Sequence, residues 1–492
     1  MIRYMSTRGS GIKVSAADGV IKGIAEDKGL YVPDSVPTIP FSFEELRDMK
    51  YEDVAKAVIG AFFTDYTDGE IADCVEEAYG EGFESEYVAP LVKLGNVSIL
   101  ELYHGKTAAF KDMALSILPY LLTTAVKKQN EDKKIAILTA TSGDTGKAAL
   151  EGFSDVDGTE IIVFYPKSGV SVVQERQMLT QKGNNTHVYG IDGNFDDAQT
   201  GVKRIFNDKN FAVKLAERGY RLSSANSINI GRLIPQIAYY VWAYGQMIKQ
   251  GSINPGDRIN IVVPTGNFGN ILAAYYAGSM GIPVNKFICA SNKNKVLTDF
   301  INTGIYDANR EFFVTNSPSM DILISSNLER LLFILSDNSG EEINKLMVEL
   351  ENNKKYVVSD KIKAGLNDFY SGFCDEKDTL SEIYKVWKEE RYLMDTHTAV
   401  AHKVYRDYVA ESKDDTPAVI VSTASAYKFA DSCISALGIK ENLNGFECIE
   451  RLNDLTGVVI PAGLKDFDKK EVKHDSVVPK EHLDKAVLEA LK

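Results

Sequence analysis

Short apolar runs, each followed by a polar or glycine-rich loop and a helical stretch, recur along the chain from about residue 95. Continuous apolar runs of this length are typical of strands in parallel sheets that helices cover on both faces. The expected strands include residues 134–138, 161–165, 186–191, 259–263, 287–290 and 418–421. The pattern predicts an α/β protein with two parallel sheets.

Changes in this alternation of apolar runs and helical stretches divide the 492 residues into four expected parts. Residues 1–90 contain acidic helical stretches and are expected to form a small structural cap. Residues 91–325 would hold the first part of the α/β core, including both sheets. The charged, helix-periodic residues 326–395 are predicted to be a helical insertion, and residues 396–492 return to the core and end in a charged extension.

The composition excludes several classes of protein. Lys and Arg number 55 against 69 Asp and Glu, a net charge of −14 that argues against nucleic acid or an anionic membrane as partner. No apolar run reaches the ~18 residues of a membrane span, and the first residues lack the features of a signal peptide. The 5 cysteines and 6 histidines lack metal-ligand spacing, so we expect free thiols, no metal site and a cytoplasmic protein.

The loop formed by Gly266, Asn267, Phe268, Gly269 and Asn270 follows an expected strand and precedes an expected helix. Glycines allow backbone amides to close around an anion, and the N-terminus of a helix adds a partial positive charge. The loop is therefore a candidate phosphate cradle, although neither a Walker loop nor a dinucleotide fingerprint is present. A strand-to-helix turn capped by asparagine is the alternative.

Three further loops carry candidate site residues. Thr141, Ser142 and Asp144 follow one expected strand, where hydroxyls and a carboxylate suit a substrate's carboxylate or phosphate; a capped helix start is the alternative. Asn226, Ser227 and Arg232 stand at another helix start, where an arginine can hold an anion in bidentate fashion, or where a cap and a surface arginine would look the same. Thr423 ends the strand at 418–421, where a hydroxyl could reach a pyridine nitrogen.

Lys111 is the candidate catalytic residue. A lysine amine attacks an aldehyde only when it is neutral, so its pKa must fall from ~10.4 through burial or nearby positive charge. Lys111 stands between Phe110 and Asp112 and precedes an apolar stretch, 113–115. A surface lysine at a helix start is the alternative, but with the loops above the sequence predicts that Lys111 holds pyridoxal phosphate as a Schiff base.

These stretches together resemble the threonine synthase family, pyridoxal-phosphate lyases of fold type II, which share the tryptophan-synthase-β-like fold. The resemblance covers nearly the whole chain, and its motifs occur in family order at residues 29–33, 104–112, 139–146, 226–229, 266–270, 317–322 and 397–400. It implies that Lys111 forms the Schiff base, that Gly266 to Asn270 hold the cofactor phosphate, and that Thr423 faces the pyridine nitrogen. It places six residues near the substrate: Thr141, Ser142, Asp144, Asn226, Ser227 and Arg232.

The resemblance implies conversion of O-phospho-L-homoserine and water to L-threonine and phosphate, by an enzyme expected to be a monomer. Lys106, Thr396 and the segment 425–427 depart from the family pattern. A serine/threonine dehydratase or a cysteine-synthase-like enzyme is the competing interpretation, but those families usually have asparagine where Asp144 stands and lack the long insertion. A catalytically silent relative that senses metabolites is a third, and Lys111 with its intact phosphate loop argues against it.

Overall fold

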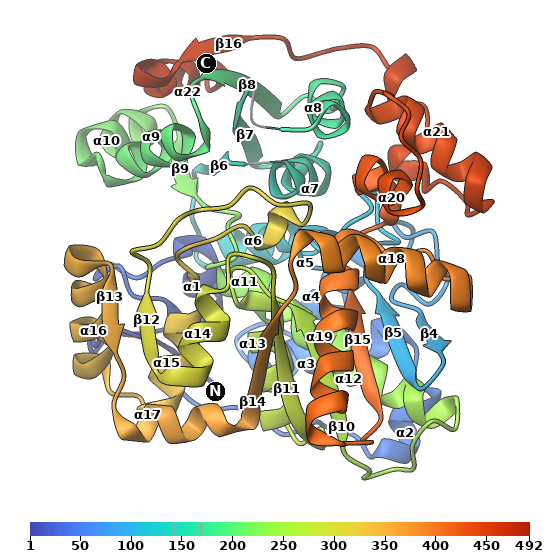
Figure 1. Ribbon diagram of the computed structural model, residues 1–492. Helices are drawn as coiled ribbons and strands as arrows, with labels where there is room; N and C mark the ends of the chain where they lie inside the picture. The colour runs from blue at the N-terminus through green and yellow to red at the C-terminus, as the bar shows by residue number, and fades with distance from the viewer. Residues whose placement is uncertain (142, 168–169) are drawn as a thin grey trace.

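The structure, a computed structural model, describes residues 1–141, 143–167 and 170–492. In this part of the chain the strands form two large sheets and two small ones. Figure 1 shows the five-stranded sheet above the six-stranded sheet, with helices packed on both. The predicted α/β class with two largely parallel sheets is confirmed.

The six-stranded sheet has the order β14-β11-β10-β15-β5-β4 and is parallel except where β4 pairs with β5. Its strands are β4 (Leu91–Leu94), β5 (Val97–Glu101), β10 (Ile259–Pro264), β11 (Val284–Ser291), β14 (Phe369–Phe373) and β15 (Ala418–Ser422). Ile261 and Val263 of β10 belong to one hydrophobic cluster, and Val262 between them belongs to another. Both faces of this sheet are therefore buried, which explains the continuous apolar runs.

The five-stranded sheet is parallel throughout, with the order β16-β8-β7-β6-β9. Its strands are β6 (Lys134–Ala140), β7 (Thr159–Pro166), β8 (Thr186–Asp192), β9 (Tyr220–Ser223) and β16 (Val477–Pro479). Along β6, Ile135 and Ile137 join the same large cluster as Ile261, whereas Ala136 and Leu138 join a separate cluster beneath α9 and α22. The large cluster is thus shared by both sheets.

The helix α12 (Pro235–Lys249), buried along all but its last residue, lies in this shared core. All its residues from Pro235 to Ile248 are buried, as expected for a helix without a polar face. It packs against α2, α3 and α13. The other helices are α1 (Ala16–Lys22), α2 (Phe43–Asp48), α3 (Tyr51–Phe62), α4 (Asp68–Tyr79), α5 (Asp112–Leu115), α6 (Leu118–Lys128), α7 (Asp144–Phe153), α8 (Val172–Leu179), α9 (Phe195–Asn207), α10 (Lys209–Glu217), α11 (Ile230–Leu233), α13 (Gly269–Ser279), α14 (Val296–Thr303), α15 (Leu328–Leu335), α16 (Gly340–Asn353), α17 (Asp360–Gly365), α18 (Glu376–Glu390), α19 (Thr396–Ser412), α20 (Ala430–Ala436), α21 (Gly445–Thr456) and α22 (Leu483–Ala490).

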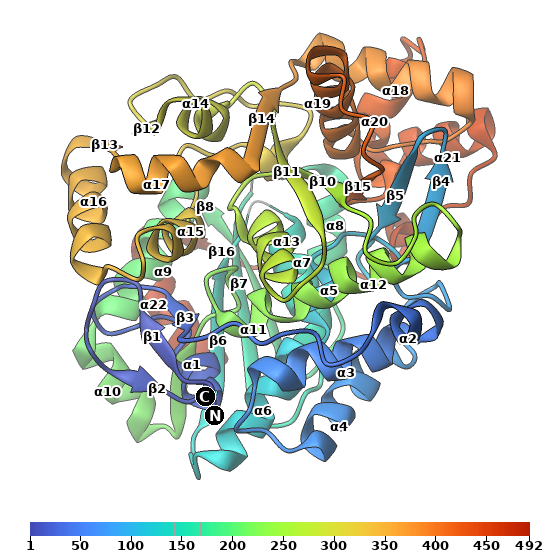
Figure 2. The same cartoon turned by 90° about the horizontal axis from the view of Figure 1, so that it is seen from below.

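The N-terminal residues combine a small antiparallel sheet with α1 to α4. The sheet consists of β1 (Tyr4–Ser6), β2 (Lys13–Val14) and β3 (Tyr31–Pro33). Seen from below, α2 and α3 lie along α12, and α4 packs against α3 and α6 (Figure 2). The unit is also tied to α15, because Glu329 accepts hydrogen bonds from Thr7 and Arg8.

The segment 326–395 is not a purely helical insertion. It contains α15 to α18, but β14 pairs in parallel with β11 at the edge of the six-stranded sheet, and β13 (Lys355–Val357) pairs with β12 (Ile305–Asp307). Only Phe369 and Ser371 of β14 are buried. An edge strand this short, with a glycine at 372, leaves too little apolar pattern to stand out from the charged helices around it.

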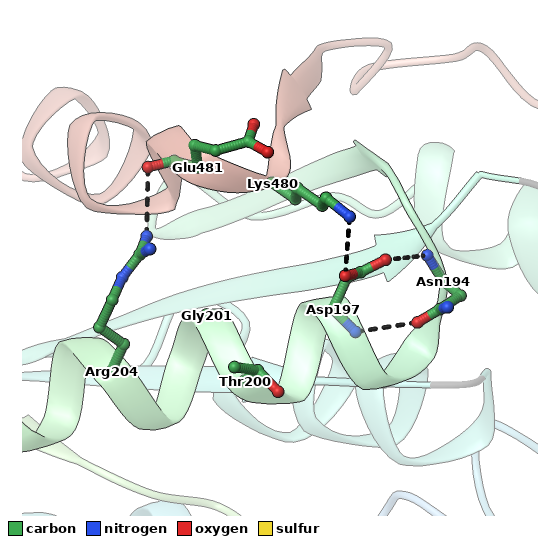
Figure 3. Close-up of a pocket in the computed structure, with 7 residues that line it drawn as sticks. All are labelled: Asn194, Asp197, Thr200, Gly201, Arg204, Lys480 and Glu481. Atoms are coloured by element: carbon green, nitrogen blue, oxygen red, sulfur yellow. Dashed lines mark hydrogen bonds and ion pairs between the residues drawn. The ribbon is translucent and has the colours of Figure 1, made fainter.

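The segment after α21 is not a free extension. It runs over the five-stranded sheet and adds β16 beside β8 (Figure 1). Leu483 and Val487 of α22 are buried against this sheet's helices. Figure 3 shows its contacts with α9, where Lys480 pairs with Asp197 at 3.0 Å and Arg204 donates to the Glu481 carbonyl at 3.1 Å. These residues border a surface cavity of about 300 Å³. Among the described residues, no helix is long and apolar enough to cross a membrane.

Candidate active site

The carboxyl ends of the two large sheets meet around Lys111. Lys111 follows β5 and immediately precedes α5, and its side chain is 13% exposed. Its Nζ lies 3.4 Å from Oγ of Ser319 and 3.7 Å from Oδ2 of Asp144, which follows β6. Burial lowers the pKa of Lys111, and Lys428 and Arg232 add to this, while Asp144 opposes it. The net direction favours the neutral amine that attack on an aldehyde requires.

The carboxylate beside Lys111 in the sequence is turned away from it. Asp112 accepts hydrogen bonds from the amide of Thr107 at 2.8 Å and from its hydroxyl at 2.6 Å. Burial raises the pKa of Asp112 to about 6. The carboxylate that contacts the Lys111 amine is that of Asp144 on another element, because successive residues of a helical turn point in different directions.

Asp144 lies at the centre of a buried cluster of polar groups. Its Oδ1 accepts hydrogen bonds from Nζ of Lys428 at 2.9 Å and from the amide of Gln174 at 3.0 Å. Although burial raises the pKa of Asp144, the Lys428 ammonium group holds it well below its usual range. The carboxylate is therefore ionised at neutral pH.

Two polar residues of this cluster, Lys428 and Gln174, are not among the site residues predicted from the sequence. The signal for Lys428 is a lysine within the apolar run 426–430, directly after a strand, where its neighbours must be buried. Gln174 carries no comparable signal, because its role depends on where α8 lies in space.

The loop from Gly266 to Asn270 has the geometry of an anion cradle. Phe268 adopts a left-handed conformation with φ 62°, and α13 begins at Gly269. Among the described residues, the backbone amides from Gly266 to Asn270 meet no acceptor. A Cβ at Gly266 would come within 2.5 Å of the Ser319 carbonyl, so a glycine is required there.

Asn270 and α15 hold this loop in place. The side-chain oxygen of Asn270 accepts hydrogen bonds from the hydroxyls of Tyr239 and Tyr240 at 2.6 and 2.5 Å. Its Nδ2 is buried and meets no acceptor in the described part of the chain. The amide and side chain of Asn327, at the start of α15, both donate to the Asn267 carbonyl at 3.0 Å. The loop is thus rigid, with donors left for a ligand.

Arg232 is a buried cation in the same region. Its side chain is 3% exposed, its Nη1 donates to the Ala225 carbonyl at 2.6 Å, and its Nε meets no acceptor among the described residues. Burial lowers its pKa to about 10. A buried guanidinium with unused donors is suited to an anionic group of a ligand.

The remaining predicted residues differ in how they meet this site. The Ser227 hydroxyl accepts a hydrogen bond from Asn327 at 3.4 Å, and Asn226 lies in the same loop, after β9. Thr423 is buried, and its carbonyl accepts the amide of Phe110 at 2.8 Å, which fixes the end of β15 beside Lys111. The Thr141 hydroxyl accepts from the amides of Gly143 and Gly146, so it stabilises its own loop. Ser142 lies outside the described residues.

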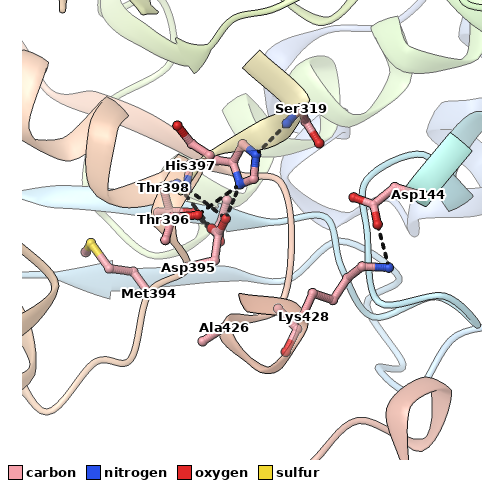
Figure 4. Close-up of polar contacts among 12 residues, drawn as sticks. Asp144, Ser319, Met394, Asp395, Thr396, His397, Thr398, Ala426 and Lys428 are labelled. Atoms are coloured by element: carbon pink, nitrogen blue, oxygen red, sulfur yellow. Dashed lines mark hydrogen bonds and ion pairs between the residues drawn. The ribbon is translucent and has the colours of Figure 1, made fainter. Parts of the chain in front are cut away.

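Ser319 is held by His397, which lies in one of the motifs of the family resemblance but is not among the predicted site residues. Nε2 of His397 accepts the Ser319 amide at 3.1 Å, and its Nδ1 lies 2.7 Å from Oδ2 of Asp395 (Figure 4). Asp395 in turn caps α19. Ser319 borders both the Lys111 amine and Gly266, so His397 supports both.

The residues present fit pyridoxal phosphate. A buried amine with a lowered pKa can bond to its aldehyde. The loop amides and Nδ2 of Asn270, which meet no acceptor among the described residues, can donate hydrogen bonds to its phosphate. In the part of the chain that the structure describes, no group of His, Cys, Asp and Glu could hold a metal ion.

Comparison with known proteins agrees with this chemistry. Residues 83–424 match the family model described as "Pyridoxal-phosphate dependent enzyme". The chain is therefore a pyridoxal-phosphate-dependent enzyme. Residues 3–79 match "Threonine synthase N terminus" and residues 398–486 match "Threonine synthase, C-terminal". The chain belongs to the threonine synthase family.

Individual relatives support the same family. The chain is 36% identical to "Threonine synthase" of Pseudomonas aeruginosa over 486 residues, 98% of this chain and 96% of that protein. It is 41% identical to human "Threonine synthase-like 1" over 445 residues, 87% of this chain but only 59% of the human protein's length. The crystal structure of PLP-bound threonine synthase from Brucella melitensis superimposes with a TM-score of 0.88 at 34% identity, covering 100% of both chains.

Proposed function

We propose that this chain is a threonine synthase that converts O-phospho-L-homoserine and water into L-threonine and phosphate. The observation that carries the proposal is the position of Ser319, which lies 3.4 Å from the Lys111 amine and borders Gly266 of the anion cradle. A reactive amine beside a rigid phosphate site is the arrangement that the reaction needs. Membership of the threonine synthase family supports the same conclusion.

The loop from Gly266 to Asn270 would hold the cofactor phosphate, and Thr423, at the end of β15, would face the pyridine nitrogen. A neutral hydroxyl at that position would leave the ring nitrogen largely unprotonated. When bound, pyridoxal phosphate supplies an extended π system that spreads the negative charge left on the substrate's α carbon.

Lys111 would act as the general base. Burial and the neighbouring cations lower its pKa, which favours the neutral amine. Once the substrate's amine has taken its place on the cofactor, Nζ can accept the proton from the α carbon. Asp144, 3.7 Å away, orients the amine. Proton loss from the β carbon then allows phosphate to leave the γ carbon, and water adds at the β carbon.

Arg232 would bind an anionic group of the substrate. Its Nε has no acceptor among the described residues, and burial excludes the water that would compete for it. Asn226 and Ser227 lie in the loop that leads into α11 and would complete this side of the substrate site.

The test is to incubate the full chain with pyridoxal phosphate and O-phospho-L-homoserine and to measure phosphate and threonine. The proposal predicts equal amounts of both, and no turnover by Lys111→Ala. Lys209→Ala, which removes an exposed lysine from α10, is the matched control and should retain full activity. Formation of 2-oxobutyrate instead of threonine, or no release of phosphate, would contradict the proposal.

A further inference from the structure

Lys428 is a lysine with no access to solvent. It lies in the short 3₁₀ helix Ala426–Phe429, and its side chain is 0% exposed. Its Nζ donates to the Thr107 carbonyl at 2.9 Å. It also pairs with Oδ1 of Asp144 at 2.9 Å (Figure 4). Burying an ammonium group costs several kcal/mol unless it is paired, roughly the scale of protein stability itself. A lysine in this position therefore requires a compensating role or partner.

The two lysines compete for one carboxylate. Lys428 contacts Oδ1 of Asp144 at 2.9 Å, and Lys111 lies farther away, 3.7 Å from Oδ2. Lys428 also has the Thr107 carbonyl as an acceptor, whereas the other close partner of the Lys111 amine is the Ser319 hydroxyl at 3.4 Å. Lys428 is thus the more closely paired of the two lysines.

The charges around Lys111 balance only when its amine is neutral. The charged groups that act on it come from separate elements: Asp144 from α7, Arg232 from α11 and Lys428 from the 3₁₀ helix. Asp112, on its own helical turn, adds a carboxylate that Thr107 already bonds. With both carboxylates ionised, the cations of Arg232 and Lys428 neutralise them, and a proton on Lys111 would leave an excess charge in a buried site.

We infer that Lys428 is a positioning residue for Lys111: it neutralises Asp144, so that this carboxylate orients the Lys111 amine without retaining a proton on it. Asp144 alone beside Lys111 would form a buried ion pair and stabilise the ammonium. This role rests on the proposed function of Lys111 in binding the cofactor, but it does not depend on which substrate the enzyme uses.

The test follows the protonation of Lys111 directly. The full chain is mixed with pyridoxal phosphate at a series of pH values and reduced at once with borohydride, and the phosphopyridoxyl label on the Lys111 peptide is quantified by mass spectrometry. The midpoint of label against pH reports the protonation of the Lys111 amine and requires no substrate.

Lys428→Met should raise this midpoint by about one pH unit or more, because an opposite charge within ~4–6 Å shifts a pKa by 1–3 units. At a pH below the midpoint, labelling would slow about tenfold. Lys428→Arg keeps the charge and should stay close to the native midpoint. The double variant Asp144→Asn, Lys428→Met removes both charges and should restore the midpoint. An unchanged midpoint in Lys428→Met would overturn the inference.

If Lys428→Met fails to fold, the inference is tested by comparing the labelling midpoint of Asp144→Asn with that of the double variant. The midpoint must be higher in the double variant, which lacks the repulsion from the Lys428 ammonium, and equal midpoints would overturn the inference. A purely structural role for Lys428 would change stability but not these midpoints. Failure to form threonine would refute the proposed function and leave this result unaffected.

Discussion

The backbone amide of Ser319 donates a hydrogen bond to Nε2 of His397 over 3.1 Å. A backbone amide can only donate, so Nε2 carries no proton, and the ring proton lies on Nδ1, facing Asp395 at 2.7 Å. His397 is therefore neutral and fixed in one tautomer. Through Ser319 it supports both the Lys111 amine and the wall of the phosphate loop at Gly266.

Replacing His397 by asparagine should weaken cofactor binding. The shorter side chain cannot reach the Ser319 amide, and a buried donor left without a partner costs about 1–3 kcal/mol. We expect the dissociation constant for pyridoxal phosphate, measured by titration of the apoprotein, to rise about tenfold or more. His187→Asn is the matched control, because it breaks a histidine–carboxylate contact of 3.1 Å on the five-stranded sheet, between β8 and β7. Equal affinities in the two variants would contradict this role.

Gly266→Ala should disrupt the phosphate site without unfolding the protein. The added methyl would lie 2.5 Å from the Ser319 carbonyl, so either the loop or Ser319 must move. Binding of inorganic phosphate and of pyridoxal phosphate, measured by calorimetry, should both weaken. Gly60→Ala in α3 meets nothing within 4 Å and should leave both affinities unchanged. Native affinity in Gly266→Ala would show that the loop does not hold the phosphate.

Arg330→Met should destabilise the protein and loosen the same loop. This fully buried arginine donates to the Tyr31 carbonyl at 2.9 Å and to the Ile228 carbonyl at 2.5 Å, and also binds the side chain of Asn327, which holds the loop. Removing such charge-assisted bonds should lower the free energy of unfolding by about 3 kcal/mol in urea. We propose that residues 1–90 act as a unit that supports the loop through these contacts.

The matched control for that experiment is Arg47→Met. Arg47 pairs with Asp48 on the surface of α2, and we expect its loss to leave the free energy of unfolding nearly unchanged, because solvent screens an exposed ion pair. A similarly small effect for Arg330→Met would remove the argument that the N-terminal unit supports the site.

Asp112 should make stability depend on pH. Burial raises its pKa from 3.8 to about 6 in the folded protein, so the native state binds more protons than the unfolded state between these values. The free energy of unfolding therefore falls as pH rises through this window, by about 3 kcal/mol from this group. Asp112→Asn lacks this contribution, so its stability relative to the native chain should improve from about pH 4 to about pH 7. Parallel pH profiles from urea unfolding would contradict this.

The strands and the cofactor loop could be predicted because their signals are local. A strand buried on both faces is a continuous apolar run, and the 266–270 loop combines glycines and asparagines between a strand and a helix. These features need no knowledge of distant residues. The predicted strands that bear the site, β10 and β15 among them, are confirmed.

The supporting residues could not be predicted because their partners are far apart in the chain. Lys428 meets Asp144, His397 meets Ser319, and Arg330 reaches Tyr31, in each case across separate elements. Sequence proximity was also misleading at Asp112, which faces Thr107 and not its neighbour Lys111. Which carboxylate accompanies the catalytic amine depends on the packing of the two sheets.

The lysine that bonds to pyridoxal phosphate can be identified directly. The full chain is reduced with borohydride in the presence of the cofactor, digested, and mapped by mass spectrometry. We expect a phosphopyridoxyl group on Lys111 and none on Lys428, the other buried lysine that contacts Asp144. A label on Lys428, on another lysine, or on none would show that Lys111 does not hold the cofactor.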